Sequence, residues 1–173
     1  MVVPAQKPFR SRQDYATPSN IIEAVKRRLL IDEFLFDFAA DADNAKAAMF
    51  WGEAEDSLSK SADEWAVRCR SGHGFGWLNP PFARIGPWAR RCMETKRLGG
   101  SVVLLVPAAI GANWYRDYVD GHASVLALNG RIAFMPDRPQ WLYPKDCILC
   151  LYSPSIAPGF AVWTWRDARR PAA

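Results

Sequence analysis

The stretch Gly76-Trp77-Leu78-Asn79-Pro80-Pro81-Phe82 constrains the fold more than any other part of the chain. Its apolar start predicts a buried strand. The two prolines must end that strand, because proline has no N–H to donate and its φ is fixed. A residue that precedes proline is also pushed towards extended backbone. The stretch therefore predicts a rigid turn that presents the Asn79 amide, the Pro80 carbonyl and the Phe82 ring at the carboxyl end of a strand, where open α/β sheets bind ligands.

These three groups suit an exocyclic amino group on a nucleobase. The nitrogen of such a group is a weak nucleophile, because its lone pair is delocalised into the ring. The Asn79 side-chain oxygen and the Pro80 carbonyl would accept its hydrogens and favour a pyramidal nitrogen with a usable lone pair. Phe82 would stack on the base, a contact worth about 1–3 kcal/mol. The structural alternative is a turn asparagine beside a core phenylalanine, and the tripeptide alone does not decide between them.

Asn79-Pro80-Pro81-Phe82 resembles the catalytic Asn-Pro-Pro-Tyr/Phe motif of S-adenosylmethionine-dependent amino methyltransferases. Other segments, and the gaps between them, resemble the phage-type DNA N6-adenine methyltransferases, the Dam family. These segments are Ala16-Thr17-Pro18, Phe36-Asp37-Phe38-Ala39-Ala40 with Asn44-Ala45, and Gly130-Arg131-Ile132-Ala133-Phe134. The resemblance extends from about Asp14 to about Ser153. It implies S-adenosylmethionine as cofactor and Asn79, Pro80, Pro81 and Phe82 as the catalytic residues.

Two segments before the motif are expected to bind the cofactor. The resemblance places Thr17-Pro18 near its methionine end, although helix capping is an alternative role for Thr17. Asp37 ends an apolar strand, and Ala39 and Ala40 leave room for a ligand to approach, so this segment would bind the ammonium group or the ribose. Many methyltransferases have a glycine-rich loop here; the family resembled has Asp-x-Ala-Ala instead.

Acidic residues further along are expected to bind the nucleoside half. Glu53 or Glu55 lies where an acid typically holds ribose hydroxyls. Asp56-Ser57-Leu58 resembles the Asp-x-Leu that borders the cofactor's adenine. The roles of the three acids stay open. The expected cofactor-binding residues are Thr17, Pro18, Asp37, Ala39, Ala40, Glu53, Asp56 and Asn79.

Charge is distributed unevenly along the chain, whose net charge is +4. Acids dominate residues 32–64, which suits a cationic small molecule. Bases gather at the N-terminus, just after the motif and at the C-terminus, which suits a polyanion such as nucleic acid. Specificity for a DNA sequence would come from residues 84–97, the loop 135–145 and the termini. The expected DNA contacts are Arg84, Arg90, Arg91, Arg131 and Trp141.

The alternation of strand and helix patterns predicts an α/β protein, a single-domain Rossmann-like methyltransferase fold with a mostly parallel sheet and helices on both faces. We expect a basic arm over 1–13, the methyltransferase domain over 14–165 and a basic tail over 166–173. Helices are expected at 21–30, 85–97 and 113–119. Strands are expected at 34–40, 47–51, 77–78, 101–107, 123–128, 130–134, 147–152 and 160–165.

Several other functions are disfavoured by the sequence. No apolar run approaches the length of a membrane span, and the N-terminus has no signal-peptide core, so we expect a cytoplasmic protein, in the host cytoplasm if phage-encoded. The four cysteines, Cys69, Cys92, Cys147 and Cys150, lack a zinc pattern and are expected to be buried thiols. The glycines at 72, 74 and 76 precede a strand rather than a helix, unlike a phosphate-binding loop.

The leading hypothesis is a DNA adenine-N6 methyltransferase, of either specific or low-specificity type, that flips its target base out of duplex DNA. A second hypothesis keeps the cofactor and changes the acceptor to cytosine N4, RNA adenine or a protein glutamine. A third is a non-catalytic DNA-binding protein on the same scaffold. The oligomeric state stays open, a homodimer being one arrangement that would cover more DNA.

Overall fold

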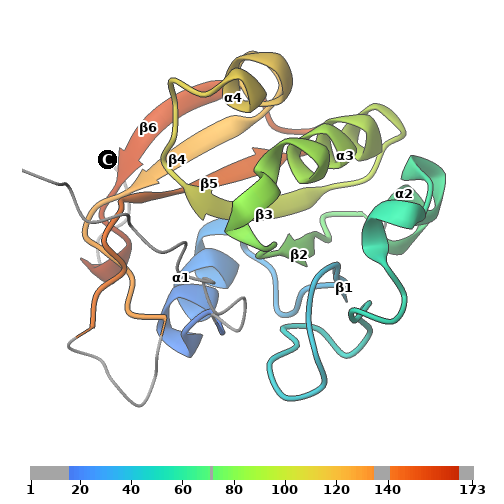
Figure 1. Cartoon of the computed structure of the whole chain (residues 1–173), viewed down its shortest axis with the longest axis horizontal. Coiled ribbons are helices and arrows are strands. Elements are labelled where there is room, and N and C mark those ends of the chain that lie inside the picture. Colours follow the sequence, from blue (N-terminus) through green and yellow to red (C-terminus); the bar gives the residue numbers. More distant parts are fainter. Residues whose placement is uncertain (1–15, 71, 135–140, 168–173) are drawn as a thin grey trace, which may run out of the picture.

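Six strands form one mixed sheet in the computed structural model, which describes residues 16–70, 72–134 and 141–167 (Figure 1). The strand order is β1-β2-β3-β5-β4-β6. The strands are β1 (Phe36–Asp37), β2 (Gly76–Leu78), β3 (Val102–Pro107), β4 (Ser124–Leu128), β5 (Cys147–Tyr152) and β6 (Gly159–Trp163). The pairs β1–β2, β2–β3 and β4–β6 are parallel, whereas β5 runs antiparallel to both of its neighbours, β3 and β4.

Helices cover both faces of this sheet (Figure 1). They are α1 (Ser19–Leu29), α2 (Ala62–Cys69), α3 (Ile85–Arg97) and α4 (Asn113–Tyr118), with short 3-10 turns η1 (Ser57–Ser59), η2 (Phe82–Arg84) and η3 (Trp165–Asp167). Successive side chains of a strand point to opposite faces of the sheet, so the core has one part on each face. Val102, Leu104 and Val106 of β3 pack with α2 and α3, while Val103 and Leu105 pack with α1.

The strand and helix bounds confirm several sequence predictions and correct others. The predicted helix 85–97 and strand 147–152 match α3 and β5. The strand expected at 34–40 is reduced to β1, and the one at 47–51 to a single parallel bridge between Asp37 and Phe50. Residues 130–134 form no strand. In both reduced cases the backbone leaves the sheet to form loops at its carboxyl edge.

The connections on either side of β1 and β2 lead in opposite directions across the sheet. After β1 the chain returns at Phe50 on the far side of β1, where Asp37 N–H donates to the Met49 carbonyl (3.0 Å). After β2 it passes through α3 to β3 on the other side. Ligands bind in the crevice at such a reversal, outside the carboxyl ends of the strands. Here that crevice lies between the residues that follow Asp37 and Leu78.

The remaining core features bear on function only indirectly. All four cysteines are buried free thiols, as expected. Burial raises the pKa of Cys69 and of Cys147 to about 12. In the described part of the chain, no helix has the length and apolarity needed to cross a membrane.

Candidate functional site

A small pocket lies where β1 and β2 end, and it contains four of the predicted cofactor-binding residues. The pocket has a volume of about 30 Å³, and these four residues are Thr17, Asp37, Ala39 and Asn79. β1 and β2 are adjacent and parallel, so their last side chains meet at one edge. Thr17 reaches this edge because it immediately precedes Pro18, the N-cap of α1. Residues distant in the sequence are thus brought together.

Asp37 is the buried charge of the pocket. Asp37 is 2% exposed, and its carboxylate accepts hydrogen bonds from the backbone N–H groups of Ala39 (3.2 Å) and Lys46 (2.9 Å). Burial raises the pKa of Asp37 to about 6, while the two N–H donors oppose that rise. A carboxylate held in this way gains from a cation that enters the pocket. Asp37 therefore has the environment of a cation-binding residue.

Asn44 and Lys46 also line the pocket, although the sequence did not predict either as a binding residue. The loop before them is braced by Asp41, whose carboxylate accepts N–H groups of Asp43 (3.1 Å) and Asn44 (3.2 Å) and the Asn44 side-chain amide (3.0 Å). Burial lowers the pKa of Lys46, and the charge of Asp37 opposes that shift. A sequence signal existed, because Lys46 is one of only two bases among the acids of residues 32–64.

The side chain of Asn79 is bonded to Thr17. Asn79 Nδ2 donates to Thr17 Oγ1 at 3.1 Å, and Thr17 is buried. The alternative role of Thr17 as a helix cap is wrong, because α1 is capped by the Pro18 carbonyl, which accepts the N–H of Ile21 (3.2 Å), with no side-chain cap. The hydroxyl of Thr17 therefore bonds the Asn79 side chain rather than the helix.

Phe82 belongs to a group of three rings beside the pocket. Its ring lies edge-on to Phe134 (6.0 Å between centroids) and Tyr143 (5.6 Å), which also contact each other (5.5 Å). Edge-to-face packing of this kind fixes ring orientation. Pro80 is buried and Pro81 is exposed, so the motif turns from the core to the surface. Phe134 and Tyr143 were absent from the predicted site, although the sequence placed both in segments near it.

The acidic residues after Trp51 lie close to the end of β1. The Ser57 hydroxyl donates to the Phe38 carbonyl, and the Trp65 indole N–H donates to the Ser57 carbonyl (3.0 Å). These bonds hold Asp56, which has a positive φ of 43°, next to the residues that follow β1. Glu53, Glu55 and Asp56 are all exposed, and Glu55 accepts the N–H of Gly52 (2.7 Å).

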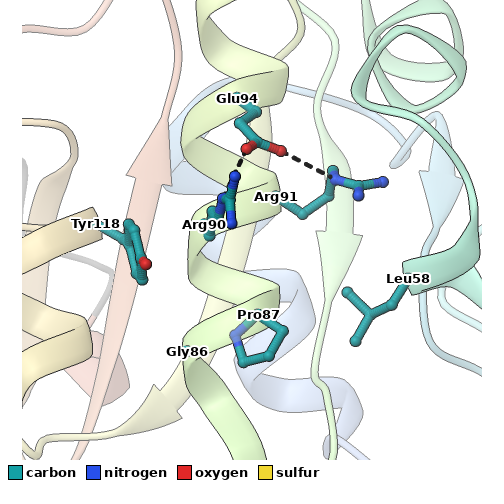
Figure 2. A pocket seen from close by; sticks show the side chains of 7 residues that line it. All are labelled: Leu58, Gly86, Pro87, Arg90, Arg91, Glu94 and Tyr118. Atoms are coloured by element: carbon teal, nitrogen blue, oxygen red, sulfur yellow. Dashed lines mark hydrogen bonds and ion pairs between the residues drawn. The ribbon is translucent and has the colours of Figure 1, made fainter.

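The predicted DNA contacts on α3 lie over a broad hollow on its outer face (Figure 2). Figure 2 shows Glu94 between two guanidinium groups, with Nε of Arg90 at 2.8 Å and Nε of Arg91 at 3.3 Å from its oxygens. The hollow has a volume of about 430 Å³ and is also lined by Leu58, Gly86, Pro87 and Tyr118. Arg84 is exposed on η2, two residues after Phe82, and forms no ion pair with any described residue.

The other predicted DNA contacts lie further along the chain. Arg131 is exposed, with its Nε 3.8 Å from Asp146 Oδ1, and its carbonyl accepts a hydrogen bond from the Arg166 guanidinium. Trp141 is 58% exposed. The predicted arm over 1–13, residues 135–140 of the predicted recognition loop and residues 168–173 of the predicted tail lie outside the described residues. Within the described ranges, no three metal-ligating side chains are grouped together.

Comparison with known proteins assigns the chain to a family. The family model for DNA N-6-adenine-methyltransferase (Dam) matches residues 5–145, which include α1, the pocket and the Asn79-Pro80-Pro81-Phe82 turn. A search of curated proteins gives no match. The matched region covers most of the chain and contains every residue of the pocket. The chain belongs to the DNA N-6-adenine-methyltransferase (Dam) family.

Proposed function

We propose that this protein transfers a methyl group from S-adenosylmethionine to the N6 amino group of adenine in duplex DNA. The observation that carries the proposal is the placement of Asp37 and Asn79 in one pocket at the carboxyl ends of adjacent parallel strands. One residue has the chemistry to bind a cation, and the other has the chemistry to bind an amino group. The reversal of connections beside β1 and β2, with helices on both faces, supports a Rossmann-like methyltransferase fold.

The residues present fit one end of S-adenosylmethionine. Asp37 is a buried carboxylate able to pair with its ammonium group, and Ala39 and Ala40 are small and partly exposed. The pocket is small, about 30 Å³, so the nucleoside half would lie outside it, towards Glu53 and Asp56. Thr17 lines the same pocket, and Pro18 follows it as the N-cap of α1. When bound, the cofactor supplies an electrophilic methyl group on a sulfonium.

The motif would bind and orient the target amino group. The Asn79 side-chain oxygen and the Pro80 carbonyl accept its two hydrogens and stabilise the positive charge that grows on nitrogen as the methyl bond forms. Phe82 stacks on the base, and its packing against Phe134 and Tyr143 holds its ring in place. Adenine inside a duplex is out of reach of such a pocket, so the base must be flipped out, at a cost of a few kcal/mol.

Binding of the DNA backbone is assigned to the basic residues near the motif. Arg84 is the best placed, because it is exposed, close to Phe82 in sequence and without an ion-pair partner among the described residues. Arg90 and Arg91 are each partly neutralised by Glu94. Arg131 and Trp141 provide a second exposed group. Phosphate contacts of this kind position DNA without reading its sequence.

The test is mass spectrometry of nucleosides from unmethylated duplex DNA incubated with the protein and S-adenosylmethionine. We expect N6-methyladenine with the wild type and almost none with Asn79→Ala, whose cofactor affinity, measured by calorimetry, should stay close to that of the wild type. N4-methylcytosine would keep the chemistry and change the base. Cofactor binding without any methylated base in DNA would contradict the proposal and direct the search to RNA or protein acceptors.

A further inference from the structure

We propose that Thr17 is a positioning residue that holds the Asn79 amide with its carbonyl oxygen directed towards the substrate amino group. The inference rests on the proposed function. It assigns to Thr17 a role in the transfer step, rather than the contact with the methionine end of the cofactor that the sequence suggested. The two roles predict different kinetic changes and can be separated.

The contact itself is specific. Asn79 Nδ2 donates to Thr17 Oγ1 at 3.1 Å, across a sequence separation of 62 residues. Thr17 is 3% exposed, so water has little access to its hydroxyl and cannot readily replace it as the acceptor. An isolated hydrogen bond on the surface would carry little weight, but this one joins the buried Thr17, two residues before α1 begins, to the turn that contains Asn79.

Because the Asn79 amide is planar, its hydrogen bond to Thr17 also fixes the direction in which its oxygen points. The nitrogen and oxygen of an Asn side chain lie on opposite sides of one carbon, so a nitrogen fixed on Thr17 sends the oxygen away from it. In the opposite orientation the NH₂ group would face the hydrogens of the substrate amino group, donor against donor. Only one of the two orientations can therefore accept the substrate's hydrogens.

Two substitutions of Thr17 separate the hydroxyl from the shape of the side chain. Thr17→Val keeps the volume and removes the acceptor, whereas Thr17→Ser keeps the acceptor and removes a methyl group. The rate of a single turnover at saturating cofactor and DNA reports the transfer step. Calorimetry with S-adenosylmethionine reports cofactor affinity, and thermal unfolding shows whether each variant folds.

We expect T17V to lower the transfer rate by about ten- to a hundredfold, the range for a lost hydrogen bond that misplaces a catalytic group. Its cofactor affinity should stay within about twofold of the wild-type value, since one hydroxyl that bonds Asn79 is not a cofactor ligand. T17S should recover most of the rate. A merely structural role would not follow this pattern, because T17S changes the packing as well.

Three results would overturn the inference. Equal rates for T17V and the wild type would show that the contact does not orient Asn79. Weakened cofactor binding with an unchanged rate at saturation would place Thr17 on the cofactor instead. Absence of N6-methyladenine with the wild-type protein would overturn the proposed function and this inference together, which distinguishes it from the first two results.

Discussion

Asp37 is the residue whose chemistry depends most on its surroundings. Its pKa of about 6 lies above the ordinary value of 3.8, chiefly because burial disfavours the charged form. Ionisation of Asp37 therefore opposes folding. The favourable contribution of the neutral form is fully present below about pH 4 and is lost as the pH rises through about 6. A bound cation would reverse this preference, so the residue suits a pocket that is completed by its ligand.

The affinity for S-adenosylmethionine should consequently depend on pH. Below pH 6, Asp37 must lose a proton before it can pair with the ammonium group. We expect the dissociation constant to be about tenfold larger at pH 5 than at pH 7.5, as a single group with this pKa predicts. Calorimetric titrations at a series of pH values measure it.

Asp37→Asn provides the control for this prediction. The variant should bind the cofactor weakly at every pH, with no inflection near pH 6, because its amide does not titrate. If the wild-type affinity is flat between pH 5 and 7.5, the titrating carboxylate is not part of the cofactor site.

Sequence reasoning succeeded for those residues whose position at the end of a strand determines what they can touch. Asp37 and Asn79 were expected at the carboxyl edge from the apolar runs before them, and both line the pocket. Lys46 was missed, because a loop stabilised by Asp41 returns it to the pocket. Such a loop leaves no periodic pattern, so the sequence does not reveal where its side chains lie.

At the scale of elements, the approach of β2 to β1 depends on Gly76. A Cβ atom on Gly76 would lie 2.3 Å from Cε2 of Phe38, far inside normal contact distance. Phe38 cannot move aside easily, since its ring is stacked on the Trp65 indole with 3.9 Å between centroids. The glycine is therefore required by packing between the strand and the residues that follow β1.

Gly76→Ala should destabilise the fold by about 1–3 kcal/mol, the usual cost of forcing extra volume into a packed core. Gly111→Ala is the matched control, because nothing lies within 4 Å of a Cβ there and its stability should change by less than about 1 kcal/mol. Chemical denaturation measures both. Similar stabilities for the two variants would mean that Phe38 and Trp65 repack without cost.

Elements with long, continuous apolar or amphipathic patterns were the predictable ones. The helix at 85–97 and the strand at 147–152 have the expected bounds, since their patterns extend through the whole element. The direction of β5 was not accessible. Cys147-Ile148-Leu149-Cys150-Leu151-Tyr152 is apolar throughout, and a strand buried on both faces has the same composition in either direction. The expected strand at 130–134 was wrong, as those residues form no ladder.

At the scale of the whole molecule, free positive charge near the motif matters more than the net charge of +4. Arg84 is exposed beside Phe82, whereas Arg90 already bonds Glu94 at 2.8 Å. An arginine without an acidic neighbour releases more counterions from DNA when it contacts a phosphate. The two residues therefore form a natural pair for comparison.

Arg84→Ala should weaken duplex DNA binding and reduce the slope of log affinity against log salt by about 0.9, the value for one phosphate contact. Arg90→Ala should change the slope less, because Glu94 offsets its charge. Fluorescence anisotropy over a range of KCl concentrations gives both slopes. A larger loss with R90A would assign the DNA to the hollow on α3 instead.

The position of β5 has a consequence for how the chain acquires its fold. β5 is hydrogen-bonded to β3 on one side and to β4 on the other, so it joins the two halves of the sheet. It nevertheless follows both β3 and β4 in the sequence. Every pocket residue precedes it. As the chain leaves the ribosome, all the pocket residues are thus synthesised while β3 and β4 still lack their shared neighbour. Shortening the chain to residue 146 would remove no residue of the pocket, and it should nevertheless abolish folding.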